Sequence, residues 1–134
     1  ILTWARTDEI RFAMRDEFED LDGPSPLWRI PGDRMKMGRE HLVPLSRQAA
    51  AVARRLMMLS KGSDYLLPSY GKDGVISAAA MLYAVYDMGY KDRVTIHGMR
   101  GVASTWANGF PTSFRASCTA VRASLSAAYS GFDR

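Results

Sequence analysis

The chain has 134 residues, which suits one domain that buries its own hydrophobic core. Its 47% hydrophobic and 24% charged residues are typical of a globular protein, and no apolar run is long enough to span a membrane. One cysteine and two histidines exclude an internal disulfide and disfavour zinc. Early acidic residues argue against a signal peptide, so we expect an intracellular protein. The net charge of +4 favours acidic partners, with nucleic acid first among them.

Residues 7–17 predict the first helix. Thr7 is a suitable N-cap, and Asp8 and Glu9 would place negative charge in the first helical turn. The apolar residues at helical spacing are Ile10, Ala13 and Met14. A turn-rich stretch, "DLDGPSP", then separates this helix from the next element.

A β-hairpin is predicted next. The apolar runs "LWRIP" (27–31) and "HLVPL" (41–45) are typical of strands, and a polar link with two glycines joins them. Three cations would lie near its turn: Arg34, Lys36 and Arg39. We expect His41, at the start of the second strand, to be structural or to lie near backbone phosphate.

Two helices follow the hairpin. Ser46 is expected to cap a helix over residues 47–60, which Gly62 would stop. The apolar stripe of this helix is expected to comprise Ala49, Val52, Ala53, Leu56 and Met57 or Leu59. After a loop with a short extended piece around Leu66, Ser77 is expected to cap an alanine-rich helix over residues 78–88 that ends at Gly89.

The last part of the chain predicts a short β-prone run over residues 93–96 and a helix over 98–108. A final helix over residues 116–129 has weak periodicity. Four or five helices with one small antiparallel β element give an α+β fold that is predominantly helical.

The candidate chemistry is the binding and cleavage of a phosphodiester. Arginine binds two phosphate oxygens with its planar fork and stays charged, and metal-free phosphoryl transfer also needs a nucleophile and a proton donor. The chain offers Arg6 near a helix start, Lys36 in the hairpin turn, and His97 with Arg100. A spacing of three puts His97 and Arg100 on about one face if the helix begins by residue 97.

Ordinary structural roles are the alternatives for each of these residues. His97 and Arg100 can mark a plain helix start, and Arg6 can be a surface arginine paired with Glu9. Lys36 can be a solvated turn lysine, because Arg34 and Arg39 are competing cations. The methionines of the hairpin and the following helix fit packing better than any cofactor role.

Four stretches, in order, give the chain its family resemblance: "LTWARTDEI", "WRIPGDRMKMGREHLVPLSRQA", "MGYKDRVTIHGMRGVASTWAN" and "AAYSG". Together they resemble the catalytic domain of tyrosine recombinases, especially the P4-like integrases of phages and genomic islands. The likeness covers nearly the whole chain, and the second and third stretches match over about twenty residues each. It implies the DNA breaking-rejoining catalytic fold of that family.

The resemblance also implies roles for single residues. Arg6 and Arg100 would clamp the scissile phosphate, with Glu9 as the supporting acidic residue. Lys36 would protonate the leaving 5′ oxygen, and His97 would transfer a proton or hold a phosphate oxygen. In "AAYSG", Tyr129 would attack phosphorus and form a 3′-phosphotyrosine bond, although a packing tyrosine is the alternative. No metal and no cofactor are implied.

Three positions depart from the family pattern. Trp4 stands where the family has glycine, and Arg15 stands where a tryptophan is usual. Cys118 falls at the place of the second histidine, and a thiol cannot donate to phosphate as an imidazole does. The stretch 111–125 around it is rich in serine, alanine and arginine and lacks the usual apolar pattern.

The resemblance identifies residues 1–134 as a piece of an integrase catalytic domain, without the N-terminal arm-binding and core-binding domains. We expect double-stranded DNA as the partner, a tetramer on DNA for the whole protein, no membrane contact, and a cytoplasmic, nucleoid-associated location in a bacterium. The piece alone is expected to be weak or inactive. The alternatives are a catalytically impaired DNA-binding remnant of the same fold and a basic helical module that binds RNA or protein.

Overall fold

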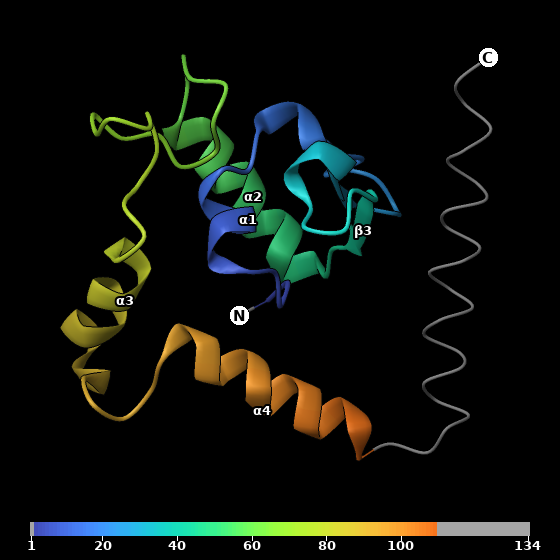
Figure 1. Cartoon of the computed structure of the whole chain (residues 1–134). Helices are drawn as coiled ribbons and strands as arrows, with labels where there is room; N and C mark the ends of the chain where they lie inside the picture. Colours follow the sequence, from blue (N-terminus) through green and yellow to red (C-terminus); the bar gives the residue numbers. More distant parts are fainter. Residues whose placement is uncertain (1, 110–134) are drawn as a thin grey trace.

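The computed structural model describes residues 2–109. Within this range four α-helices accompany a three-stranded antiparallel sheet, which confirms the predicted α+β class. The elements are α1 (Thr7–Arg11), β1 (Phe18–Glu19), β2 (Leu27–Ile30), β3 (His41–Pro44), α2 (Arg47–Leu59), α3 (Ala80–Val85) and α4 (Ile96–Asn108) (Figure 1). Cys118, Tyr129 and the predicted helix over residues 116–129 lie outside the described residues.

The predicted hairpin is confirmed by the pairing of β2 with β3, which runs from Leu27 opposite Pro44 to Ile30 opposite His41. A short strand that the sequence did not predict, β1, pairs with the other edge of β2. A 3₁₀ turn, Gly32–Arg34, begins the link between β2 and β3. The link folds back tightly, because a Cβ atom on Gly32 would lie 2.8 Å from the carbonyl oxygen of Gly38.

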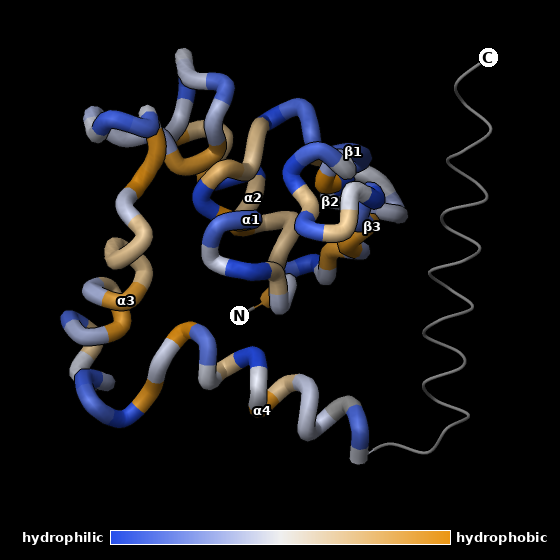
Figure 2. The backbone as a smooth tube through the Cα atoms, viewed as in Figure 1, coloured by the Kyte–Doolittle hydropathy of each residue, from blue (hydrophilic) through white to orange (hydrophobic). Residues whose placement is uncertain are grey.

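The hydrophobic core lies where the sheet meets the first two helices. Trp28 is almost fully buried, and its ring stacks on Phe18 with a centroid separation of 5.4 Å. Hydrophobic segments gather at β2 and β3, whereas the turns that join the strands are mainly hydrophilic (Figure 2). The buried residues of this core are Ala5, Ala13, Trp28, Ile30, Val43, Leu45, Ala49, Ala50 and Leu66.

Helix α2 begins as predicted, because the Ser46 hydroxyl accepts a hydrogen bond of 3.1 Å from the Ala49 amide. Its buried face is narrower than the predicted stripe. Val52 and Leu59 are exposed, and Ala50 is buried instead. The alanines Ala49 and Ala50 of this face belong to the same core cluster as Trp28 and Ile30 of β2. The helix ends at Leu59, Ser60 is its C-cap, and Gly62 follows with a φ of +92°.

Helix α1 is much shorter than the predicted helix over residues 7–17. Arg6, not Thr7, is its N-cap, and the helix ends at Arg11. The chain beyond it pairs with a distant segment: the Leu66 amide donates to the carbonyl of Ala13 at 2.8 Å. A 3₁₀ turn, Arg15–Glu17, follows. A long-range pairing therefore replaces the second half of the predicted helix.

The two later helices also differ from prediction at their starts. Helix α3 begins at Ala80 without a side-chain cap, so the predicted cap at Ser77 is wrong. The chain leaves it through a π-helical turn, Tyr86–Tyr90, in which Gly89 has a φ of +85°. The predicted β run over residues 93–96 is not a strand, because the Thr95 hydroxyl accepts from the Gly98 amide at 2.9 Å and α4 begins at Ile96.

Candidate functional site

The first site residue to consider is Arg6, which lies at the start of α1 and is held there by Glu9. The Arg6 amide donates to one oxygen of the Glu9 carboxylate at 2.6 Å, and Arg6 Nη1 donates to the other at 2.7 Å. Glu9 is buried, whereas the Arg6 side chain is 57% exposed. The fixed carboxylate thus restrains a guanidinium that remains open to a ligand.

The charge of Glu9 is stabilised by its cationic neighbours. Burial alone would raise the pKa of the Glu9 carboxyl. The hydrogen bonds from the Arg6 amide and side chain, with the positive charges of Arg6 and Arg100, outweigh burial and lower that pKa below its ordinary value. Glu9 is therefore negatively charged at neutral pH, and its charge interacts with both arginines.

The first of two clefts beside Arg6, named here the hairpin cleft, has a volume of about 440 Å³. Arg6 lines it from the start of α1, and Lys36 lines it from the hairpin link. Lys36 is exposed and forms no ion pair with any described residue. The remaining lining residues are Asp8, Glu9, Phe12, Met14, Arg34 and Tyr65.

The second cleft, named here the helix cleft, has a volume of about 380 Å³ and lies between the starts of α1 and α4. Arg6, Thr7 and Asp8 line it from one side, and His97 and Arg100 line it from the other. In Figure 1 the first turns of α4 lie beneath α1.

The two residues from α4 differ in their environment. His97 is exposed, whereas Nη1 of Arg100 is buried and has no hydrogen-bond partner among the described residues. A buried N–H donor without a partner costs about 1–3 kcal/mol, so an anionic oxygen would be a favourable partner for it. The helix cleft therefore has one donor that is suited to an anion.

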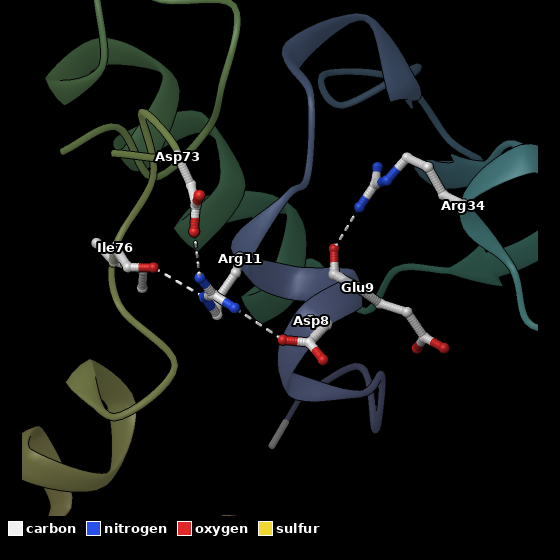
Figure 3. Close-up of polar contacts among 6 residues, drawn as sticks. All are labelled: Asp8, Glu9, Arg11, Arg34, Asp73 and Ile76. Atoms are coloured by element: carbon white, nitrogen blue, oxygen red, sulfur yellow. Dashed lines mark hydrogen bonds and ion pairs between the residues drawn. The ribbon is translucent and has the colours of Figure 1, made fainter. Parts of the chain in front are cut away.

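Helix α1 is anchored from two sides by arginines (Figure 3). Arg34 reaches from the hairpin link, where its Nη2 donates to the Glu9 carbonyl at 2.7 Å. Arg11 is buried and reaches the opposite way, where its Nε donates to the Ile76 carbonyl at 2.8 Å. Arg11 also pairs with Asp8 at 2.9 Å and with Asp73 at 3.6 Å. A five-residue helix is unstable alone, so these contacts fix its position.

The structure thus brings Arg6 next to Lys36 in one cleft and next to His97 and Arg100 in the other. Helix α4 begins at Ile96, so the spacing of three puts His97 and Arg100 on about one face of the helix. His41 starts β3, opposite Ile30. Tyr129 and Cys118 lie outside the described residues.

Six lining residues were not predicted as parts of the site: Thr7, Asp8, Phe12, Met14, Arg34 and Tyr65. Asp8 and Arg34 had a local signal, because they stand two residues from Arg6 and Lys36 in the sequence. Tyr65 had none, because it reaches the hairpin cleft through the bridge between its backbone and Met14.

Within residues 2–109 no group of three or more histidine, cysteine or acidic side chains is arranged to hold a metal ion. No helix in this part of the chain has the length and apolar character needed to cross a membrane.

Comparison with known proteins finds phage and prophage integrases. The chain is 39% identical to the integrase of Enterobacteria phage P4, in a match that covers 77% of the chain and 26% of that protein. It is 36% identical to prophage integrase IntA and 38% identical to prophage integrase IntZ, both of Escherichia coli strain K12. These matches cover 83% and 81% of the chain, and 27% and 26% of the relatives. The chain spans about a quarter of the length of these relatives. No protein-family profile matches it, and no solved structure matches it.

Proposed function

The chain belongs to the P4-like integrase family, and from this premise we propose that it supplies the phosphate-binding and catalytic residues of a site-specific DNA recombinase. The proposal includes the tyrosine-recombinase catalytic fold, with residues 1–134 as part of the catalytic domain. One observation carries it: Arg6 lines two adjoining clefts, with Lys36 in one and with His97 and Arg100 in the other. These are the four cationic or proton-donating residues that the family resemblance selected.

The proposed reaction is a transesterification at phosphorus. The hydroxyl of Tyr129 attacks the scissile phosphate, a bond forms between the tyrosine oxygen and phosphorus, and the bond to the 5′ oxygen breaks. Lys36 gives its proton to that leaving oxygen, and His97 accepts the proton that the Tyr129 hydroxyl loses. The phosphotyrosine conserves the energy of the phosphodiester, so the reverse reaction can join a new strand without ATP.

In this proposal the two arginines stabilise the charge that develops on the phosphate. Charge on the phosphate oxygens grows as the tyrosine attacks, and guanidinium donors that are already in place stabilise it without reorganisation. Glu9 restrains Arg6, and the buried Nη1 of Arg100 is a donor without a protein partner in the described part of the chain. Both properties are those of a preorganised oxyanion site.

The proposal places the protein on double-stranded DNA. Its positive charge supports this partner, and a tetramer on DNA in the cytoplasm is the assembly that the family resemblance implies. These points depend on the same premise as the reaction and are tested with it.

The test is a trapping assay with the complete protein that carries this sequence. A pool of duplexes, each nicked beside the scissile bond and randomised around it, releases a short product and leaves a covalent protein–DNA adduct. Tyr129→Phe should abolish the adduct, and Tyr83→Phe, at an exposed tyrosine of α3, should not. Salt-sensitive DNA binding without any adduct would identify the impaired remnant, and absence of DNA binding would exclude both recombinase hypotheses.

A further inference from the structure

The hairpin link that carries Lys36 is tied to the rest of the protein by Arg34. Its Nη2 donates to the backbone carbonyl of Glu9 at 2.7 Å, in the middle of α1, and its Nη1 forms an ion pair with Glu17. The Arg34 side chain is 17% exposed, and that of Glu17 is 5% exposed. One guanidinium therefore joins the hairpin link, helix α1 and the turn that follows α1.

Glu17 is itself fixed by the protein around it. Its second carboxylate oxygen accepts from the ring Nε1 of Trp28 at 2.9 Å and from the Met14 amide at 3.3 Å. Trp28 is a central residue of the core in β2. The chain of contacts thus runs from the core through Glu17 to Arg34, and a buried carboxylate with three donors cannot follow a moving partner.

Arg34 is poorly suited to bind phosphate itself. Both of its terminal nitrogens already donate to protein oxygens, and most of its side chain is covered. Lys36, two residues later, is exposed and forms no ion pair among the described residues. The tight approach of Gly32 to Gly38 closes the link between the strands, so displacement of Arg34 would displace Lys36 as well.

We propose that Arg34 is a positioning residue for Lys36: by pairing with Glu17 and the Glu9 carbonyl, it fixes the hairpin link over the cleft that Arg6 lines. The inference rests on the proposed function, because it assigns Arg34 to the proton transfer of Lys36. It assigns different roles to Arg34 and Lys36, two of the three cations that the sequence places near the hairpin turn.

The first experiment measures geometry and does not depend on activity. Nitroxide labels are attached at Met37→Cys in the link and at Ala51→Cys on α2, in a Cys118→Ser background. Pulsed electron paramagnetic resonance measures the distance between the labels, which reports the position of the link relative to the core. Arg34→Met should broaden or shift the distance distribution. Arg39→Met, at an exposed arginine of the same link, should leave it unchanged. An unchanged distribution in Arg34→Met would overturn the inference.

The second experiment asks whether the displaced residue is Lys36. A 5′-phosphorothiolate at the scissile bond leaves as a thiolate, which needs no proton from a general acid. Lys36→Met and Arg34→Met should each cut the ordinary bond about 100-fold more slowly than wild type, and should approach wild-type rate on the sulfur substrate. Loss of a merely structural residue would slow both substrates equally.

The outcomes separate the inference from its premise. If sulfur rescues Lys36→Met but not Arg34→Met, Arg34 does not serve Lys36 and the inference is wrong. If sulfur does not rescue Lys36→Met, the general-acid role of Lys36 fails, and the distance measurement still decides whether Arg34 holds the link. Should Arg34→Met not fold, Glu17→Gln makes the same predictions, because it keeps an acceptor for Trp28 and removes the charge that pairs with Arg34.

Discussion

Trp4, which stands where the family resemblance predicts glycine, has a left-handed backbone conformation with a φ of +54°. This conformation costs a residue with a Cβ about 1–2 kcal/mol. The side chain more than offsets this cost, because 45% of the residue is exposed and roughly half of its surface is buried. That burial, about 100 Å², contributes ~2.5 kcal/mol.

These values predict an unusual order of stability for two substitutions. Trp4→Ala loses the packing and keeps the strained backbone, whereas Trp4→Gly loses the packing and relieves the strain. Glycine also gives the unfolded chain more conformational freedom, which lowers the free energy of unfolding by about 0.5–1 kcal/mol. Both variants should be less stable than wild type, and Trp4→Gly should be the more stable of the two by about 0.5–1 kcal/mol.

The assay is urea unfolding followed by circular dichroism, with the free energy of unfolding extrapolated to water. The matched control is Trp106, another exposed tryptophan, which lies in α4. There the order should reverse, because glycine inside a helix is about 1 kcal/mol less favourable than alanine. If alanine is as good as glycine at position 4, the strain argument is refuted.

Three further predictions concern charged residues. Because the pKa of Glu9 is lowered, its contribution to stability is complete above the pKa of an unfolded glutamate, about 4.3, and is lost as pH falls through the lower folded value. Urea unfolding between about pH 3 and 6 should therefore show a shallower loss of stability in Glu9→Gln. Arg100→Ala should reduce the slope of log affinity for duplex DNA against log salt by about 0.9, measured by fluorescence anisotropy, and an unchanged slope would exclude a phosphate contact. Arg15 donates from Nη1 to the Met57 carbonyl at 2.7 Å, so Arg15→Met should lower the free energy of unfolding by about 1.5 kcal/mol. The control is Arg55→Met, at an exposed arginine of α2, the helix that contains Met57. It should change the free energy of unfolding by no more than about 0.5 kcal/mol.

The elements that the sequence predicted well have local signals. The hairpin was predicted because two short apolar runs flank a polar link with two glycines, and the pairing of Leu27 with Pro44 agrees. Ser46 caps α2 through a bond to an amide three residues away. In both cases the interactions that decide the structure lie within about twenty residues of one another.

The elements that were predicted wrongly are decided by distant or competing contacts. The helix over residues 7–17 stops early because the Arg15 amide donates to the Asp64 carbonyl at 2.9 Å, a contact that no helical periodicity reveals. The β-branched run over residues 93–96 resembles a strand, but the Thr95 hydroxyl satisfies a helix amide instead. The exposure of Val52 on α2 likewise depends on which face meets the sheet.

The candidate site divides in the same way. Lys36, His97 and Arg100, which line the clefts with Arg6, were selected by the family motifs, and so was Glu9. Arg34, which anchors the hairpin link, was not. Arg34 looked like a second phosphate-binding cation beside Lys36 until its two bonds to Glu9 and Glu17 were seen. A residue type in a basic stretch does not reveal whether its charge is already used by a partner.

For anion binding, it therefore matters more which cations form ion pairs within the protein than that the net charge is +4. Among the described residues near the clefts, Arg6 is paired with Glu9 and Arg34 with Glu17, so much of their charge is compensated within the protein. Lys36 and Arg100 form no ion pair in the same part of the chain. They lie in different clefts that Arg6 joins. An anion in either cleft would meet one cation that forms no ion pair and the exposed side of Arg6.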